Sequence, residues 1–138
     1  MTPNNPALES HTWHGIGYQP LVLTEQWQVA WLNWEPLFER ANLGEIERHT
    51  ETDEVFVLQR GQSGLFVVTP QGIELTEMEP GVIYNIKRGV WHNLIASREA
   101  AWLIVEARDT HLNDTETRQM TALERDQLER QFPAWFIA

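Results

Sequence analysis

The chain is dominated by short runs in which hydrophobic and polar residues alternate, separated by turns that contain glycine or proline. Alternation with a period of two is typical of β-strands that bury one face. The pattern predicts strands at 27–34, 45–49, 54–59, 64–69, 73–78, 82–86, 91–96 and 101–107. No helix-length pattern interrupts them, so we exclude a parallel α/β sheet. We expect an all-β fold, an antiparallel sandwich or barrel.

The length of 138 residues predicts a single domain that is large enough to bury a core, with its barrel at 27–107. Residues 1–12 are polar and contain two prolines, so we expect a flexible tail there.

The end of the chain has a different pattern. Thr121 to Glu124 has the form of a capping box, which predicts a short C-terminal helix over 121–132 that ends before Pro133. The closing segment 135–137 is too apolar to remain in solvent. We expect it to pack against the barrel or against a second subunit.

The first predicted strand is apolar on both faces. Trp27, Val29 and Trp31 form one face, and the residues between them form the other. A strand of this kind is covered on both sides. We expect one face in the barrel interior and the other against a partner subunit or the C-terminal segment, and we predict a homodimer.

The charge of the chain excludes several classes of partner. The formal net charge is −10, with 20 acidic against 10 basic residues, and no run of basic residues is present. Nucleic acid and anionic membrane surfaces are therefore not expected partners. The first residues do not resemble a signal peptide and no apolar run could span a membrane, so a cytoplasmic location is expected. The absence of cysteine excludes disulfides and thiolate metal ligands.

The candidate chemistry begins with the stretch 47–61. Glu47 and His49 are two residues apart near the end of a predicted strand, so their side chains leave the same face. A polar turn follows, and Glu54 then opens the next strand, which ends at Gly61. This is a hairpin with an imidazole and carboxylates at its mouth.

A second stretch, 81–96, has a related form. Two β-rich runs flank the turn Lys87-Arg88-Gly89, and His92 lies near the start of the second run.

The two stretches together resemble the paired motifs of the cupin superfamily. The first motif is H-x-H, four residues, E, six residues, G, and the sequence matches its spacing with Glu47 in place of the leading histidine. His49, Glu54 and Gly61 occupy the other positions. An alternative register takes His49 as the leading histidine and Glu51 as the second position, but it leaves too few residues before Glu54, so we prefer the first register.

The second motif is G, five residues, P-x-G, two residues, H, three residues, N. It matches at Gly81, Gly89 and His92, whereas Lys87 replaces the proline and Ala96 replaces the asparagine. The resemblance covers 47–96 closely. The superfamily includes oxygenases, isomerases, lyases and proteins without catalytic activity, so the resemblance does not identify a substrate.

The resemblance implies an antiparallel β-barrel of the jelly-roll type found in cupins. It also implies one divalent metal ion held between the hairpins by Glu47, His49, Glu54 and His92. Histidine nitrogen and carboxylate oxygen suit Mn, Fe, Ni, Co or Zn. Such a protein would act on a small polar or anionic organic molecule as an oxygenase, isomerase or lyase. The alternative is a metal-free cupin that binds a small ligand or acts in assembly, because the leading histidine is missing.

Two further roles are predicted near this site, for four residues. Glu47 or Tyr84 is a candidate acid or base, provided that Tyr84 faces the interior with its neighbours two residues away. Lys87 and Arg88 are candidates for binding an anionic substrate. The alternatives are a packed core tyrosine and two solvated turn residues.

Overall fold

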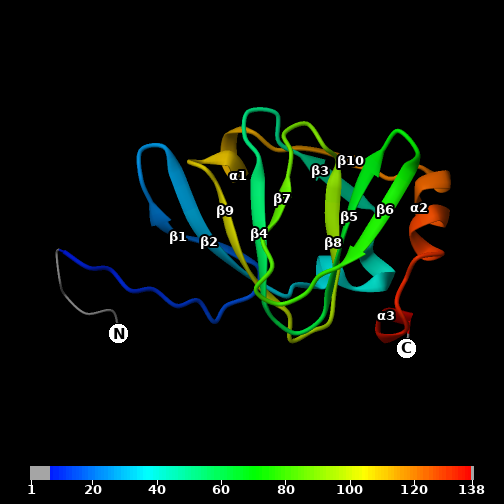
Figure 1. Ribbon diagram of the computed structural model, residues 1–138, viewed down its shortest axis with the longest axis horizontal. Coiled ribbons are helices and arrows are strands. Elements are labelled where there is room, and N and C mark those ends of the chain that lie inside the picture. The colour runs from blue at the N-terminus through cyan, green and yellow to red at the C-terminus, as the bar shows by residue number, and fades with distance from the viewer. Residues whose placement is uncertain (1–6, 138) are drawn as a thin grey trace.

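The structure is a computed structural model that describes residues 7–137. It is built from two five-stranded sheets that face each other (Figure 1). The first sheet has the order β1 (Tyr18–Leu23), β2 (Trp27–Asn33), β9 (Ala101–Ala107), β4 (Glu54–Arg60) and β7 (Tyr84–Ile86). The second has the order β10 (Glu116–Gln119), β3 (Glu45–Arg48), β8 (His92–Ala96), β5 (Ser63–Thr69) and β6 (Gly72–Glu77).

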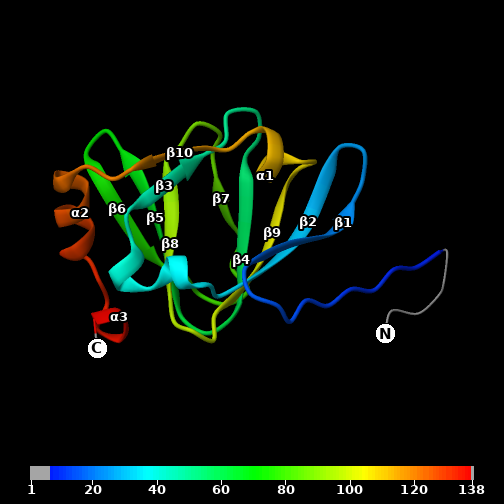
Figure 2. The ribbon, with the colours of Figure 1, turned by 180° about the vertical axis from the view of Figure 1, so that it is seen from behind.

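All strand pairs in both sheets are antiparallel. The helical segments are short, and each connects two strands or follows the last strand. They are η1 (Pro36–Phe38), η2 (Arg40–Asn42), α1 (Thr110–Asn113), α2 (Ala122–Glu129) and α3 (Ala134–Ile137). Seen from behind, the chain runs from β2 through the two η segments into β3, beside β10 (Figure 2). Within residues 7–137 no helix has the length and apolarity needed to cross a membrane.

The predicted antiparallel all-β fold with a short C-terminal helix is confirmed, and each of the eight predicted strands is present. The strands form two sheets rather than one closed barrel. β1 and β10 were not predicted, because Pro20 interrupts the pattern of β1 and the residues of β10 are all polar. Of the expected tail at 1–12, residues 1–6 lie outside the described residues, and 7–12 are exposed.

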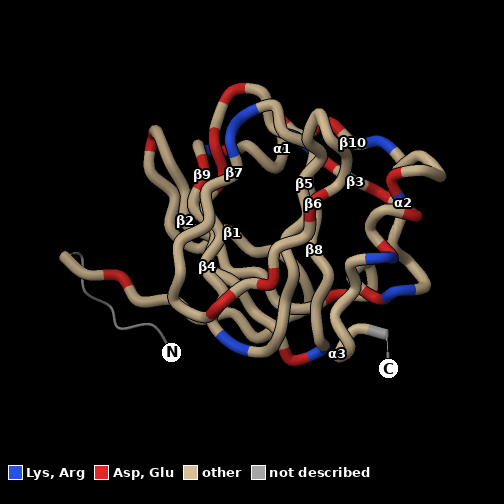
Figure 3. Tube along the Cα trace, turned by 45° about the vertical axis from the view of Figure 1, so that its right-hand side comes forward, with Lys and Arg blue, Asp and Glu red and all other residues tan. Residues whose placement is uncertain are grey.

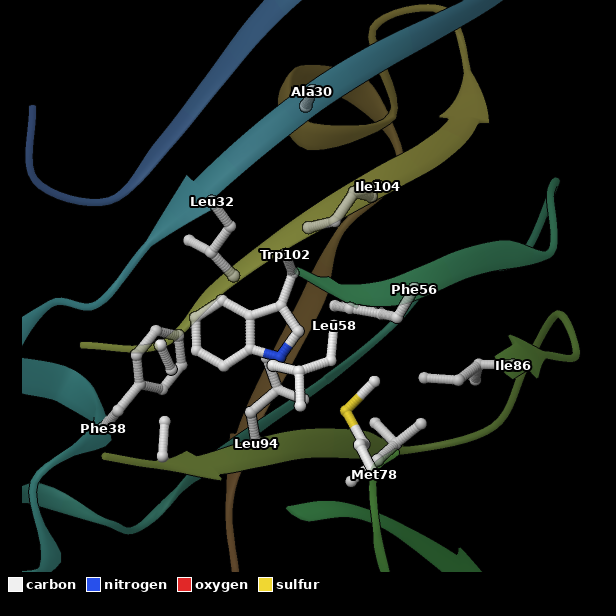
Figure 4. Packing of buried hydrophobic residues seen from close by; sticks show 13 residues of the cluster. Ala30, Leu32, Phe38, Phe56, Leu58, Met78, Ile86, Leu94, Trp102 and Ile104 are labelled. Carbon is white, nitrogen blue, oxygen red and sulfur yellow. The ribbon is translucent and has the colours of Figure 1, made fainter. Parts of the chain in front are cut away.

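The main core lies between the two sheets. Trp102 of β9 has no exposed surface and lies at the centre of the cluster, beside Leu32 and Phe38 (Figure 4). The rings of Trp102 and Phe38 are 5.4 Å apart between centroids. The indole N–H of Trp102 donates to Ser63 Oγ at 3.1 Å, so its polar atom is satisfied inside the core. This packing holds the two sheets in the arrangement that the site requires.

A second core lies on the outer face of the second sheet, where the C-terminal segment covers it. Leu128 of α2 is buried against Ile46 and Phe66, and Trp135 and Phe136 pack on the same cluster. The expectation that the closing segment packs on its own barrel is thus confirmed. It does not cover the tryptophan face of β2, and Trp27 remains 46% exposed.

The capping box of α2 is present as predicted. Thr121 Oγ1 accepts from the Glu124 N–H at 3.1 Å, and Glu124 Oε1 accepts from the Thr121 N–H at 2.8 Å. The helix ends at Glu129, with Arg130 as its C-cap, rather than continuing to residue 132 as expected.

Removal of this cap is expected to weaken the C-terminal segment. Thr121→Ala loses the acceptor for the Glu124 N–H and should lower the free energy of unfolding by about 1 kcal/mol, measured by urea denaturation. Thr121→Ser keeps the hydroxyl and should retain most of the stability. Equal stability of Thr121→Ala and the parent protein would show that the cap contributes nothing.

Candidate metal centre

The four predicted metal ligands meet between the two sheets. Glu47 of β3 and His92 of β8 are cross-strand partners, so their side chains start from adjacent backbone positions. His49 follows directly after β3, and Glu54 opens β4 on the opposite sheet. One ligand atom from each of the four residues lies within 4.8 Å of the others. The structure therefore brings together residues from both motifs in an arrangement that could hold a metal ion.

Glu54 is the centre of this group. Its Oε1 lies 3.0 Å from His49 Nε2 and 3.0 Å from His92 Nε2. All three side chains are almost fully buried, with exposed fractions of 5%, 5% and 1% for Glu54, His49 and His92. Glu47 lies at the open side, where its Oε1 is 3.7 Å from His92 Nε2 and its side chain is 35% exposed. The site thus has three buried groups and one more accessible carboxylate.

Both histidines present Nε2 to the site, because their other nitrogen is engaged elsewhere. His49 Nδ1 lies 2.8 Å from the carbonyl oxygen of Asp114, and His92 Nδ1 lies 3.0 Å from that of Val90. A carbonyl oxygen only accepts, so each Nδ1 must carry the hydrogen. Each Nε2 is left to bind either a proton or a metal ion, which is the arrangement usual for metal-ligating histidines.

The charges in the site are strongly coupled. Burial opposes the charge of His49, but the hydrogen bond and negative charge of Glu54 outweigh it and raise the pKa of His49 to about 9. The pKa of His92 is also raised, by the same balance between burial and Glu54. Burial likewise opposes ionisation of Glu54, but its hydrogen bonds with His49 and His92 lower its pKa to about 2. Without a metal ion, protons therefore hold the two imidazoles against the carboxylate.

The two motif turns are tied together by backbone contacts. The N–H of Gly89 donates to the carbonyl oxygen of His49 at 2.6 Å, and Gly89 has a φ of 82°, which favours glycine. Asp53 adds a second tie, because its Oδ1 accepts from the N–H of Arg88 at 2.9 Å. These contacts fix the mouth of one hairpin against the other and explain why a glycine stands at position 89.

A third tie comes from the segment after α1. The carboxylate of Asp114 accepts from the Thr50 N–H at 2.9 Å and from the Glu51 N–H at 2.8 Å. The same residue supplies the backbone oxygen that holds His49 Nδ1. Asp114 therefore orients His49 without being a ligand itself.

Removal of the Asp114 carboxylate is expected to loosen His49. Asp114→Ala should weaken metal binding about 10-fold, the lower end of the range for residues that orient metal ligands, as measured by competition with a metal indicator. Asp114→Asn keeps one acceptor oxygen and should lose less affinity. An unchanged affinity in Asp114→Ala would mean that the loop holds His49 on its own.

A pocket of about 230 Å³ adjoins the ligands. The four ligands line one part of its wall, and apolar side chains line another: Leu32, Leu37, Phe38, Phe56, Leu94 and Ile104. A pocket with apolar walls and a few convergent polar groups is the usual form of a small-molecule site.

The other residues predicted for the site lie outside this pocket. Tyr84 packs against the main core, and its hydroxyl oxygen accepts from the Glu79 N–H at 2.9 Å. Lys87 and Arg88 are exposed in their turn, with Lys87 Nζ 3.8 Å from a carboxylate oxygen of Asp53. Tyr84, Lys87 and Arg88 are not among the residues that line the pocket. Of the catalytic candidates, Glu47 alone lines it.

Sequence reasoning missed several polar residues that line the pocket, among them Tyr18, Glu106 and His111. Glu106 could have been found, because it shares the inward face of β9 with Trp102 and Ile104, where a charged residue is unexpected. Burial and the negative charge of Glu54 raise the pKa of Glu106 to about 8. Tyr18 had no such signal, because its strand was not predicted.

This architecture is similar to that of several proteins of known structure. No protein-family model and no curated protein sequence matches the chain. A cupin-2 domain protein from Shewanella frigidimarina is similar in structure, with a TM-score of 0.53 and 23% identity over 69% of this chain and 85% of that protein. KdgF from a Halomonas species gives a TM-score of 0.56 and 14% identity, over 74% of this chain and 92% of KdgF.

A variant of PAC13 from Streptomyces, with uridine, gives a TM-score of 0.57 and 10% identity, over 83% of this chain and 90% of that chain. These identities show a shared fold. The chain therefore has the cupin fold, as its resemblance to the cupins implied.

Proposed function

We propose that this protein binds one divalent metal ion through His49, His92, Glu54 and Glu47 and acts on a small organic molecule in the adjoining pocket. The observation that carries the proposal is the convergence of His49 Nε2 and His92 Nε2 on one buried carboxylate oxygen, each at 3.0 Å, with both Nδ1 atoms already engaged. Two imidazoles and two carboxylates suit a first-row divalent ion such as Mn, Fe, Ni, Co or Zn.

The metal ion and its most accessible ligand would each contribute to the chemistry of the site. A bound divalent ion would act as a Lewis acid toward an oxygen atom of the substrate. Glu47 is the most accessible of the four ligands, with a side chain that is 35% exposed. This makes Glu47 the residue best placed to exchange a proton with a molecule in the pocket, in agreement with the prediction from the sequence.

One observation favours the alternative of a metal-free ligand-binding protein. Glu54 is already hydrogen bonded to both buried histidines, so the three groups can satisfy one another when protons take the place of a metal ion. The glutamate at position 47, where the motif has histidine, points in the same direction.

Thermal unfolding with added ligands separates the two functions. If the metal function is correct, one of the five ions should stabilise the folded protein by about 2.7 kcal/mol when present at 100 times its Kd. Ca²⁺ serves as the control, since it prefers a larger set of oxygen ligands. Stabilisation by small organic molecules with no response to any of the five ions would instead favour the metal-free function.

We also propose that the protein forms a homodimer through the outer face of the first sheet. Cross-strand pairing places Val29, Val105 and Val55 in one row of this face and Trp31, Leu103 and Val57 in the next. An uncharged face suits self-association in a chain whose net charge is −10, because charged surfaces of two copies would repel each other. Light scattering should show a dimer for the parent protein and a monomer for Val105→Lys. A monomeric parent would exclude the dimer.

A further inference from the structure

A second group of polar side chains lies in the same pocket, on the sheet that carries Glu54. Gln28 of β2 and Glu106 of β9 are cross-strand partners with exposed fractions of 0% and 5%. The hydroxyl of Tyr18 donates to Glu106 Oε1 at 2.6 Å, and Gln28 Nε2 donates to the Tyr18 hydroxyl oxygen at 2.8 Å. With His111 of α1, these residues form what we call the Tyr18 cluster.

Gln28 also orients His111. Its amide Nε2 lies 3.0 Å from His111 Nδ1, and an amide nitrogen only donates, so Nδ1 accepts and the neutral ring carries its hydrogen on Nε2. Gln28 Oε1 accepts from the N–H of Asp109 at 3.0 Å, which holds the start of α1 in place. Tyr18, His111 and Glu106 all line the pocket. The buried amide of Gln28 therefore holds Tyr18 and His111 in position there.

The cluster is costly for the fold. Glu106 Oε1 accepts from the Tyr18 hydroxyl, and a protonated Glu106 shares a second hydrogen bond with Glu54. Moving a carboxyl group out of water into the core nevertheless costs free energy. The next inward positions along β2 and β9, Ala30 and Ile104, are apolar, so packing alone does not require a carboxyl group here. A role in binding explains why the carboxyl group lines the pocket.

The charge of the pocket restricts what can bind in it. Five glutamates line it: Glu35, Glu45, Glu47, Glu54 and Glu106. No lysine or arginine is among the lining residues of the described chain. A divalent ion would balance the charge of two carboxylates, those of Glu47 and Glu54. Acidic residues also outnumber basic residues along the chain as a whole (Figure 3). A carboxylate or phosphate group on the ligand would then meet Glu35 and Glu45, with no lysine or arginine side chain to compensate its charge.

We infer that the Tyr18 cluster is a binding subsite for an uncharged, hydroxyl-bearing molecule, which Tyr18 and His111 contact directly and Glu106 and Gln28 hold in place. A hydroxyl group both donates and accepts, so it can pair with the remaining lone pair of the Tyr18 oxygen and with the His111 Nε2–H. This inference rests on the proposed function, in that the other end of the molecule would lie at the metal ligands. It narrows the predicted substrate from polar or anionic to polar and uncharged.

The test compares matched probes on the metal-loaded protein. Sorbitol, xylitol, glucose and ribose are titrated beside the sugar acids gluconate and ribonate, with binding followed by protein NMR. At least one uncharged probe should bind roughly 10-fold more tightly than the acid of the same carbon chain. Equal or tighter binding of the acids would overturn the inference, and so would the absence of binding by all uncharged probes.

Two variants assign the effect to the cluster. Tyr18→Phe should lose about 10-fold in affinity for the best uncharged probe, with a metal content close to that of the parent protein. Glu106→Leu removes the acceptor of the Tyr18 hydroxyl and should weaken the binding of the same probe. If Tyr18→Phe keeps full affinity, the subsite is wrong while the metal site stands. If the parent holds no metal ion, the proposed function fails whatever the probes show.

Discussion

His92→Ala is expected to abolish metal retention while the protein stays folded. His92 is 1% exposed, its Nδ1 is fixed by the Val90 carbonyl, and its Nε2 faces Glu54 at 3.0 Å. Loss of this nitrogen removes a buried ligand that no neighbouring histidine can replace, and the affinity should fall on the order of 100-fold or more. The measurement is metal affinity by isothermal titration, beside a circular dichroism spectrum that verifies the fold.

The matched control for this variant is His111→Ala. His111 lines the same pocket, but its Nδ1 is held by Gln28 and it is not one of the four grouped ligands. Its removal should leave the metal affinity within a few-fold of the parent value. A similar loss in both variants would mean that binding depends on the pocket as a whole, and an unchanged affinity in His92→Ala would refute the ligand assignment.

The metal-free protein should lose stability as the pH rises from neutral to about 9. The pKa of His49 is raised from 6.5 to about 9 in the folded chain, mainly because Glu54 outweighs the effect of burial. A raised pKa means that the stabilising contribution is fully present below pH 6.5 and is lost as the pH rises through 9. Glu106 acts in the same direction, since its pKa is raised from 4.5 to about 8 and the folded protein disfavours its anion. The melting temperature should fall by roughly 5–10 °C between pH 6 and 9.

The metal-loaded protein should not show this decline over the same range. Metal binding requires both Nε2 atoms to be unprotonated, so a higher pH favours the bound ion over the competing protons. In the metal-free His49→Gln variant, the melting temperature should lose the part of its decline that His49 causes and that ends near pH 9. A melting temperature of the metal-free parent that stays level or rises with pH would contradict the coupling between His49 and Glu54.

The residues of the two motifs were predictable because their geometry is local. Spacing by two near the end of a strand placed Glu47 and His49 on one side, and the turn lengths fixed Glu54 and His92 relative to the glycines. Gly61 illustrates the constraint, because its φ of 74° favours glycine and a Cβ there would lie 2.6 Å from the Cα of Ala100. Turn chemistry of this kind leaves a clear signal in a single sequence.

The Tyr18 cluster was not predictable in the same way. Tyr18 and Glu106 are 88 residues apart and meet only because β1, β2 and β9 are neighbours in one sheet. Strand order is set by long-range pairing, which a local pattern does not encode. The positions of Lys87 and Arg88 could not be predicted either, because the direction of a turn side chain depends on contacts such as the one between Lys87 and Asp53.

Metal content by elemental mass spectrometry tests the central claim most directly. The parent protein and the His49→Ala/His92→Ala double variant would be purified side by side, without a histidine tag or chelator, and reconstituted with each of the five candidate ions. The site predicts about one metal ion per chain in the parent and none in the variant. A parent that stays free of metal after every reconstitution, or a double variant that holds as much metal as the parent, would contradict it.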